Sequence, residues 1–245
     1  MTLCPNFNGK VALVTGGSRG IGAAIADALG QAGAVVAVNY RERADAANAL
    51  VAGLNKSGHR AMAIAADVSS ASAVRTMVDR VSAAVGPIDI LINNAGLAIV
   101  RGVDDLTEDD FDKTIAVNLK SAFLCTQAVL PGMQARKWGR IVNITSGAAR
   151  GAGAIGPYYN ASKAGMEGLT RGYAARLVTF GITVNSVAPS LIDTDMMSGR
   201  PELKSRVPLG RPGRSDEVAQ AVLMVLGNDY MTGQTIALNG GMAFN

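Results

Sequence analysis

Short runs of aliphatic and β-branched residues alternate along this chain with longer segments whose apolar and polar positions follow the spacing of helices. Five of the runs are strong and lie at residues 11–14, 35–38, 88–92, 141–144 and 182–184. Runs of this kind are typical of strands buried on both faces of a parallel sheet. Weaker runs at 61–66 and 234–238 bring the expected number of strands to seven.

The segments between these runs are long enough to form helices, and they cover residues 20–31, 43–57, 70–84, 107–137, 157–179 and 215–227. Because strand and helix alternate strictly, the pattern predicts a doubly wound α/β fold around one seven-stranded parallel sheet. No proline-rich or serine-rich linker and no internal repeat divides the chain. We therefore expect residues 1–245 to form a single Rossmann-like domain.

The acidic segment Thr107-Glu108-Asp109-Asp110 opens one of these predicted helices. Its spacing is typical of a capping box, with carboxylates placed where the helix dipole favours them. A pair of catalytic carboxylates is the alternative, but no other feature of the chain supports glycosidase-type chemistry.

Composition and charge limit the class of protein. Hydrophobic residues make up 49% of the chain and aromatic residues only 4%, so a large core must be built from aliphatic side chains. The net charge of +4 comes from interspersed acidic and basic residues. This pattern argues against nucleic-acid binding but permits an anionic ligand or an acidic carrier protein. The sequence has no signal-peptide pattern and no long apolar stretch, so we expect a cytoplasmic protein without membrane contact.

The cysteines and the histidine exclude several chemistries. Cys4 and Cys125 are far apart and have no companion motif, which indicates neither a disulfide framework nor a metal site. His59 is the only histidine, so a Ser-His-Asp triad and a histidine-metal centre are excluded. We expect His59 in a solvated loop ahead of the third strand.

A glycine-rich segment, Thr15-Gly16-Gly17-Ser18-Arg19-Gly20-Ile21-Gly22, joins the first predicted strand to the first predicted helix. At this place in a parallel sheet, glycines let backbone N–H groups approach a pyrophosphate and let the helix pack closely on the sheet. The spacing Gly-x-x-x-Gly-x-Gly differs from the common Gly-x-Gly-x-x-Gly fingerprint of dinucleotide-binding domains. Taken alone, such a turn could also be a tight connection that binds nothing.

The end of the second predicted strand bears on the choice of cofactor. NAD-binding sheets usually place an acidic residue there for the ribose 2′-hydroxyl, whereas this chain has Asn39-Tyr40-Arg41 and no carboxylate before Glu42. Arg41 and Arg19 are suited to charge-assisted bonds with a 2′-phosphate, which predicts NADP(H). The alternative is that both are ordinary solvated arginines.

Tyr159 and Lys163 are four residues apart in a predicted helix, which puts them on one face. A phenol has a pKa of about 10, and a nearby ammonium stabilises the phenolate, so this spacing predicts a lowered pKa for Tyr159. The glycine-rich segment 147–157 just before the helix is interpreted as an active-site loop, with a passive connector as the alternative.

Taken together, these motifs resemble the classical short-chain dehydrogenases/reductases over nearly the whole chain. The residues that carry the resemblance are Thr15-Gly16-x-x-x-Gly20-Ile21-Gly22, Asn93-Asn94-Ala95-Gly96, Asn118, Ser146, Tyr159-x-x-x-Lys163 and Asn239-Gly240-Gly241. The resemblance implies a Rossmann-like oxidoreductase that transfers hydride between NADP(H) and a carbonyl carbon.

The resemblance also implies roles for individual residues. Tyr159 would be the general acid, and Ser146 would hydrogen-bond the carbonyl oxygen. Lys163 would hold the nicotinamide ribose and lower the pKa of Tyr159, and Asn118 would anchor a water in a proton relay. With the glycine-rich turn included, the expected cofactor contacts are Gly16, Gly17, Ser18, Arg19, Gly20, Ile21, Gly22, Arg41, Asp67, Val68, Asn93, Ala95, Gly96, Tyr159, Lys163, Pro189, Ile192 and Thr194.

Within that family, the segments 9–15 and 181–185 are most similar to the bacterial 3-oxoacyl-carrier-protein reductases of fatty acid biosynthesis. The resemblance implies reduction of a 3-oxoacyl thioester or a similar ketone, and an acidic acyl carrier protein as partner. Three features depart from the pattern: Phe180 replaces a basic residue, Ser190 replaces a glycine, and the segment from Asp195 to Pro208 is short for a substrate lid. Lys137 is a candidate for part of a basic docking surface.

Two other functions remain open at this stage. One is a secondary-alcohol or polyol dehydrogenase that acts on a free small molecule. The other is a regulatory protein that senses NADP(H), although such a protein needs the phosphate cradle and not the catalytic set. The sequence does not determine the substrate, its stereochemistry, the direction of reaction or the pathway.

The resemblance implies a homotetramer in which helices 107–137 and 157–179 pair between subunits, with close approach at Ala161, Ala164, Gly165 and Gly168.

Overall fold

Seven parallel strands form one sheet in the computed structural model, which describes residues 5–195 and 205–244. The strand order is β3-β2-β1-β4-β5-β6-β7. The strands are β1 (Val11–Val14), β2 (Val35–Tyr40), β3 (Ala61–Ala65), β4 (Ile90–Asn93), β5 (Gly139–Ile144), β6 (Ile182–Pro189) and β7 (Thr235–Leu238). The predicted seven-stranded parallel sheet is confirmed.

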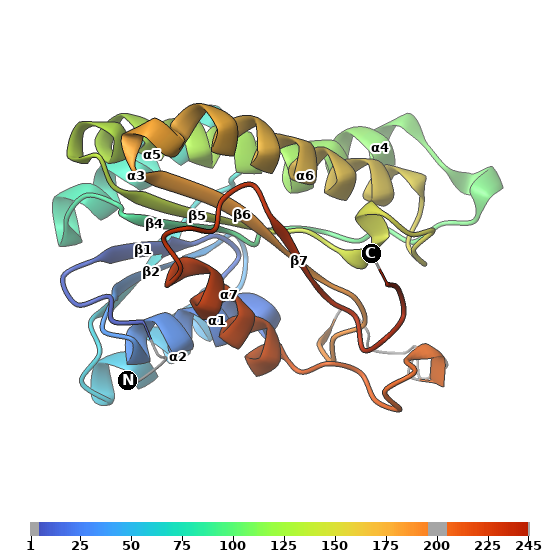
Figure 1. Ribbon diagram of the computed structural model, residues 1–245, viewed down its shortest axis with the longest axis horizontal. Helices are drawn as coiled ribbons and strands as arrows, with labels where there is room; N and C mark the ends of the chain where they lie inside the picture. Colours follow the sequence, from blue (N-terminus) through green and yellow to red (C-terminus); the bar gives the residue numbers. More distant parts are fainter. Residues whose placement is uncertain (1–4, 196–204, 245) are drawn as a thin grey trace.

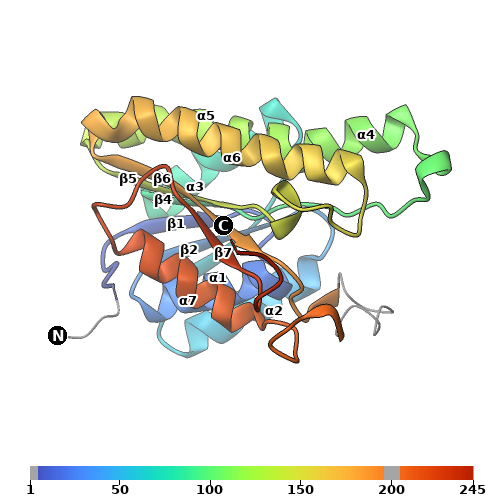
Figure 2. The same ribbon diagram turned by 45° about the vertical axis from the view of Figure 1, so that its right-hand side comes forward.

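Helices cover both faces of the sheet, as Figure 1 shows. One face carries α1 (Gly20–Gln31), α2 (Ala44–Lys56) and α7 (Ser215–Leu226). The other carries α3 (Ala71–Val85), α4 (Glu108–Thr114), α5 (Ser121–Arg136) and α6 (Pro157–Leu177). Figure 2 shows the same two layers from a second direction, with α5 and α6 side by side.

The segment predicted as one helix over 107–137 is not a regular α-helix throughout. A π-helical turn, Ile115–Lys120, lies between α4 and α5. Thr107 caps α4 by accepting a bond from the backbone N–H of Asp110 at 3.1 Å. The Asp110 carboxylate does not complete a capping box, because it pairs with Arg101 at 3.1 Å instead.

Alternation along the strands divides the core into two layers. Ala12 and Val14 of β1 pack with the layer under α1 and α7, whereas Val11 and Leu13 pack with the layer under α3 and α5. The strands are therefore apolar on both faces, as the runs of aliphatic residues predicted. Each fully buried Val, Leu or Ile side chain contributes roughly 1.5–3 kcal/mol to folding, so aliphatic residues can supply most of this core, in which aromatic residues such as Phe7 are few.

Two further expectations concern individual residues. His59 lies in the loop before β3, as predicted, but it is half-buried. Cys125 is buried without a disulfide partner, and burial raises its pKa to about 12, while Cys4 lies outside the described residues. None of the helices in residues 5–195 and 205–244 has the length and hydropathy that crossing a bilayer requires.

The strand order positions the functional site. The chain leaves β1 toward β2 on one side of the sheet, and later returns to β4 on the other side of β1. At such a switch point, the loops that follow adjacent strands diverge and open a crevice at the carboxyl ends of the strands.

Candidate active site

A cleft of about 1000 Å³ lies at the carboxyl ends of the strands. Its walls come from the turn after β1, the loops after the other strands and the segment 239–243. The expected cofactor contacts that line it are Gly16, Ser18, Arg19, Gly20, Ile21, Gly22, Arg41, Asp67, Val68, Ala95, Gly96, Tyr159, Lys163, Pro189, Ile192 and Thr194. The fold thus brings together residues from most of the chain.

The turn after β1 needs glycine at two positions. Gly16 has a φ of +59°, and a Cβ there would lie 2.9 Å from the Cα of Ala95. A Cβ on Gly22 would lie 2.5 Å from the carbonyl oxygen of Gly16. No side chain caps the start of α1, so its first N–H groups remain available to an anion.

Gly17 does not line the cleft, contrary to the sequence-based expectation. It is buried, and a Cβ there would meet the backbone of Val14 and the side chain of Val38 at 3.1 Å. Gly17 is therefore a packing residue that lets the turn lie close against β2.

The loop after β4 is attached to the same turn by side-chain bonds. Asn94 donates from Nδ2 to the carbonyl oxygens of Thr15 and Gly16, both at 3.0 Å. The hydroxyl of Thr15 accepts from the N–H groups of Asn94 and Ala95, also at 3.0 Å. These bonds hold two walls of the cleft at a fixed separation.

The expectation that Asn93 lines the cleft is corrected by the structure. Asn93 is the last residue of β4, is buried, and donates to Asn143 at 2.8 Å and to Thr126 at 3.3 Å. Successive strand residues point to opposite faces, so Asn93 faces α5 while Asn94, the next residue of the same motif, reaches the cleft. The parity of the strand was the signal that could have distinguished them.

At the end of β2, the side chain of Asn39 hydrogen-bonds to the backbone of the glycine-rich turn. Its side chain is buried, accepts from the N–H of Gly16 at 3.2 Å and donates to the carbonyl oxygen of Ala66 at 3.1 Å. Arg41 pairs with the adjacent Glu42, and Arg19 pairs with Asp195 at 3.0 Å. Both arginine side chains line the cleft and are exposed, so both guanidinium groups have carboxylate partners that solvent also reaches.

Asp67 lines the cleft beyond the end of β3. Its carboxylate accepts from the hydroxyl of Ser69 at 2.6 Å and from the backbone N–H of Ser69 at 2.9 Å. The hydroxyl bond in particular lowers the pKa of Asp67 below its usual value. The carboxylate is therefore fixed and charged at neutral pH.

Three of the four expected catalytic residues meet in the cleft. Ser146 follows β5 and begins a 3-10 turn, Gly147–Ala149, where its Oγ accepts from the N–H of Ala148 at 3.1 Å. Tyr159 and Lys163 come from the first turns of α6, and both side chains are buried. Nζ of Lys163 donates to the carbonyl oxygen of Ile144 at 2.9 Å.

The pKa shifts in this cluster have burial as their main cause. Burial lowers the pKa of Lys163 to about 8. The predicted lowering of the Tyr159 pKa by Lys163 is corrected: burial raises the pKa of Tyr159, and the neighbouring Ser146 side chain opposes that rise. The ammonium lies 5.8 Å from the centre of the Tyr159 ring and is bonded to Ile144. The spacing along α6 places Tyr159 and Lys163 on one face of the helix, but it does not determine which group the Lys163 ammonium contacts.

Asn118 lies in the π-helical turn, is fully buried and does not line the cleft. Its Oδ1 accepts from the N–H of Leu97 at 2.8 Å, and its Nδ2 donates to the carbonyl oxygen of Leu97 and to Ser162, both at 3.1 Å. The amide thus ties the loop after β4 to α6, and both its oxygen and its nitrogen have protein partners. Interruptions of this kind in a helix are frequent at functional sites.

Pro189, Ile192 and Thr194, the expected contacts after β6, lie where they were expected. Part of the segment from Asp195 to Pro208 lies outside the described residues.

Several other cleft residues were not found from the sequence. The additional lining residues include Arg43, Arg150, Glu167, Arg206 and Met242. Most of them follow no periodic pattern, because they stand on loops or at element ends.

Comparison with known proteins gives a consistent result. A family model described as short chain dehydrogenase matches residues 10–204. The chain is 43% identical to a (2S)-[(R)-hydroxy(phenyl)methyl]succinyl-CoA dehydrogenase subunit of Thauera aromatica, with 95% of this chain and 96% of the relative covered. It is 41% identical to a 3-oxoacyl-[acyl-carrier-protein] reductase of Pseudomonas aeruginosa, with 97% and 98% covered.

A solved structure is similar over the same length. It is a short chain dehydrogenase from Burkholderia cenocepacia in complex with NADP, with a TM-score of 0.90 and 43% sequence identity. The match covers 97% of this chain and 99% of the other.

Proposed function

This chain belongs to the short-chain dehydrogenase family, and we propose that it is an NADP-dependent oxidoreductase that reduces the ketone of a 3-oxoacyl thioester or a similar compound to a secondary alcohol. The observation that carries the proposal is the grouping of Ser146, Tyr159 and Lys163 in the same cleft as the glycine-rich turn.

The residues of the cleft fit a phosphorylated dinucleotide. The turn after β1 brings backbone and the start of α1 to the cleft without a Cβ at Gly16 or Gly22. Arg19 and Arg41 border the same region, and exposed ion pairs such as theirs are worth only about 0–1 kcal/mol. A 2′-phosphate could therefore replace their carboxylate partners at little cost.

NADPH, when bound, supplies the hydride for the carbonyl carbon. Tyr159 donates its phenolic proton to the carbonyl oxygen, and its raised pKa keeps that proton in place at neutral pH. Ser146 Oγ accepts from Ala148 through a lone pair, so its hydroxyl group can still donate its hydrogen to the same oxygen as negative charge develops there. Lys163, with a pKa of about 8, can exchange a proton near neutral pH, and it is the residue that would hold the nicotinamide ribose by resemblance to the family.

The substrate class rests on similarity. The Pseudomonas relative is a 3-oxoacyl-[acyl-carrier-protein] reductase, and the Thauera relative is named for a hydroxylated CoA thioester. Both names support an acyl thioester that carries oxygen on a nearby carbon. The second name also favours oxidation of a hydroxyacyl thioester as the alternative direction.

Whether the acyl thioester is attached to a carrier protein or to CoA is a separate question. An acidic acyl carrier protein is the partner that the reductase resemblance implies, and Lys137, exposed after the end of α5, is a candidate contact. Phe180 is partly exposed at the position where a basic residue was expected. A free CoA thioester is consistent with this loss of charge.

A substrate panel tests the proposal directly. CoA-linked and carrier-linked 3-oxoacyl thioesters, simple ketones, and sugars and polyols in the oxidative direction are each assayed with NADP and NAD cofactors. We expect kcat/KM for an acyl thioester with NADPH to exceed that for the free ketones by about tenfold or more. Turnover confined to sugars or polyols would establish the alternative of a small-molecule dehydrogenase, and no turnover at all would favour an NADP(H)-sensing protein.

The choice of NADPH yields a prediction about Arg41. Arg41→Ala should raise KM for NADPH by about tenfold or more and leave KM for NADH nearly unchanged, because a charge-assisted bond contributes roughly 1.5–3 kcal/mol. Arg214→Ala is the matched control, since Arg214 is 55% exposed like Arg41 and is also paired with an acidic neighbour, but lies outside the cleft. Equal use of NADH and NADPH by the unmodified protein would contradict the assignment.

We also propose a homotetramer, with a cytoplasmic location. Ala161, Ala164 and Gly168 form an exposed face of small residues on α6. Gly165 does not belong to that face, because a Cβ there would lie 2.7 Å from the side chain of Leu119 in the same chain. Light scattering should give about four times the chain mass of 25.1 kDa, whereas a value near 25 kDa at micromolar concentration would rule the tetramer out.

A further inference from the structure

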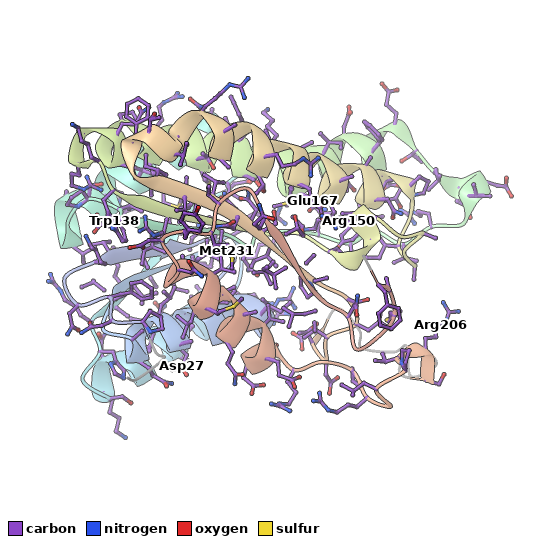
Figure 3. All side chains as sticks on the ribbon, in the orientation of Figure 1. Asp27, Trp138, Arg150, Glu167, Arg206 and Met231 are labelled. Carbon is purple, nitrogen blue, oxygen red and sulfur yellow. The ribbon has the colours of Figure 1, made fainter. Side chains whose placement is uncertain are left out.

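An ion pair attaches the turn that carries Ser146 to the helix that carries Tyr159 and Lys163. Arg150 directly follows the turn Gly147–Ala149, and its Nε donates to Oε2 of Glu167 at 3.0 Å. Glu167 is one helical turn beyond Lys163 in α6. Figure 3 shows Arg150 and Glu167 beside each other where α6 faces the loop after β5.

The carboxylate of this pair is unusually buried. Glu167 is only 6% exposed, whereas the Arg150 side chain is 44% exposed. Oε1 of Glu167 is buried and has no hydrogen-bond partner among the described residues, and the second nearby guanidinium, that of Arg171, lies 3.9 Å from Oε2. Buried ion pairs contribute little net stability, and an unpartnered buried oxygen is unfavourable. The pair is therefore better explained by the position it enforces than by the stability it adds.

The turn itself can transmit that position to Ser146. The N–H of Ala149 donates to the carbonyl oxygen of Ser146 at 2.9 Å, and the N–H of Gly151 donates to that of Gly147 at 3.0 Å. Because these bonds close the turn on itself, a displacement at Arg150 moves Ser146 as well.

A second attachment holds the loop just beyond the turn. Nδ2 of Asn160 donates to the carbonyl oxygens of Gly151 and Ala152 at 2.9 and 2.7 Å. These bonds fix residues 151–152 but not the guanidinium of Arg150. Of these two attachments to α6, the ion pair thus lies nearer to Ser146 along the chain.

We propose that Arg150 and Glu167 are positioning residues that fix the hydroxyl of Ser146 against the phenol of Tyr159. The inference rests on the proposed function, since it assumes that both hydroxyl groups meet the substrate oxygen. Neither Arg150 nor Glu167 takes part in the chemistry. Their effect reaches the reaction only through the turn and α6.

The test uses Arg150→Met, Glu167→Gln and the double variant in the full-length protein. Each should lower kcat by about 10- to 100-fold, the range expected for a small misplacement of a catalytic group, with KM for NADPH unchanged within about twofold. If the pair acts as one unit, the double variant should be no slower than the slower single variant. Arg150→Lys, which keeps the charge, should restore part of the rate.

The pH profile separates positioning from general loss of structure. Ser146 opposes the effect of burial on Tyr159, so a displaced Ser146 should raise the pKa of Tyr159. In the alcohol-oxidation direction, where Tyr159 must accept a proton, the rising limb of the profile should therefore move to higher pH in both single variants. A purely structural contact would reduce the amount of folded enzyme without moving the limb.

A matched control is available at the opposite end of the sheet. Arg136 and Asp89 form a pair of the same kind, with an Nη2 to Oδ1 distance of 3.1 Å and a carboxylate that is 10% exposed. Asp89→Asn should leave kcat and the pH profile within about twofold of the unmodified protein. Glu167→Gln removes the buried charge and leaves a partly exposed Arg150 side chain, so it keeps the test informative if Arg150→Met, which leaves the buried carboxylate without this partner, fails to fold.

Ser146→Ala distinguishes failure of this inference from failure of the proposed function. If Ser146→Ala is slow but Arg150→Met and Glu167→Gln keep the normal rate and profile, the positioning role is wrong. If Ser146→Ala itself turns over normally, the proposed function of the cluster is wrong. A raised KM for the carbonyl substrate with unchanged kcat in Arg150→Met would also overturn the inference, because it would make Arg150 a substrate-binding residue.

Discussion

Tyr159→Phe should lower kcat by about 10³-fold or more while the affinity for NADPH stays within about twofold. The substitution removes only the phenolic oxygen, which is the proposed proton donor to the substrate carbonyl. The ring remains, so the packing of this buried side chain against its neighbours is kept. Steady-state kinetics and a fluorescence titration with NADPH measure the two quantities separately.

Tyr158→Phe is the matched control for that experiment. Tyr158 is the adjacent residue of α6, is equally buried, and donates its hydroxyl to the carbonyl oxygen of Ile99 at 2.8 Å. Its loss should lower stability by about 1 kcal/mol and change kcat only a few-fold. Near-normal turnover in Tyr159→Phe would exclude the proposed acid, whatever the control does.

Lys163→Met should remove most of the activity and at the same time stabilise the protein at neutral pH. The rate should fall by about 10²-fold or more, because Lys163 is the proposed contact to the nicotinamide ribose and the proton-exchanging group beside Tyr159. Stability should rise because burial holds the pKa of Lys163 at about 8, below its ordinary value of 10.5. The folded protein at pH 7 thus keeps an ammonium in an environment that disfavours its charge.

The pH dependence of this gain has a definite sign. Below pH 8 the lysine is protonated in both the folded and the unfolded chain, so the full unfavourable contribution is present. Between the folded pKa of about 8 and the ordinary value of 10.5, the unfolded chain binds more protons, so the stability of the unmodified protein rises with pH. The advantage of Lys163→Met should be roughly 1–3 kcal/mol at pH 7, after the lost bond to Ile144 is counted, and should shrink toward pH 10.

Urea unfolding of both proteins at pH 7 and pH 9.5 measures this difference. Lys56→Met, at an exposed position at the end of α2, provides a control in which a solvent-exposed lysine is replaced. A difference between Lys163→Met and the unmodified protein that is the same at both pH values would show that the lysine is not destabilised by burial.

Prediction from the sequence succeeded where a feature depends on neighbouring residues along the chain. The helix expected at 20–31 has those bounds in the structure, because the glycine-rich turn starts it and the apolar spacing continues to Gln31. It was less successful where a side chain had two directions available. Asn93 and Asn94 are both amides at a strand end, and only the parity of β4 sends one into the core and the other to the cleft.

The sequence by itself determined the alternation of strands and helices, the glycines of the phosphate cradle, and the shared helical face of Tyr159 and Lys163. Each of these features follows from backbone sterics or from a period of a few residues, so residues that are close in sequence are enough to predict it. Tertiary structure alone decided the partners: Lys163 with Ile144, Arg19 with Asp195, and Arg150 with Glu167. The residues of these pairs are 17 to 176 positions apart, and they meet only because the strand order brings the loops after β1, β5 and β6 to one edge of the sheet. Electrostatic and hydrogen-bond energies depend on distance in space and on burial. The pKa values and the geometry of the site therefore follow from the folded structure and not from the sequence pattern.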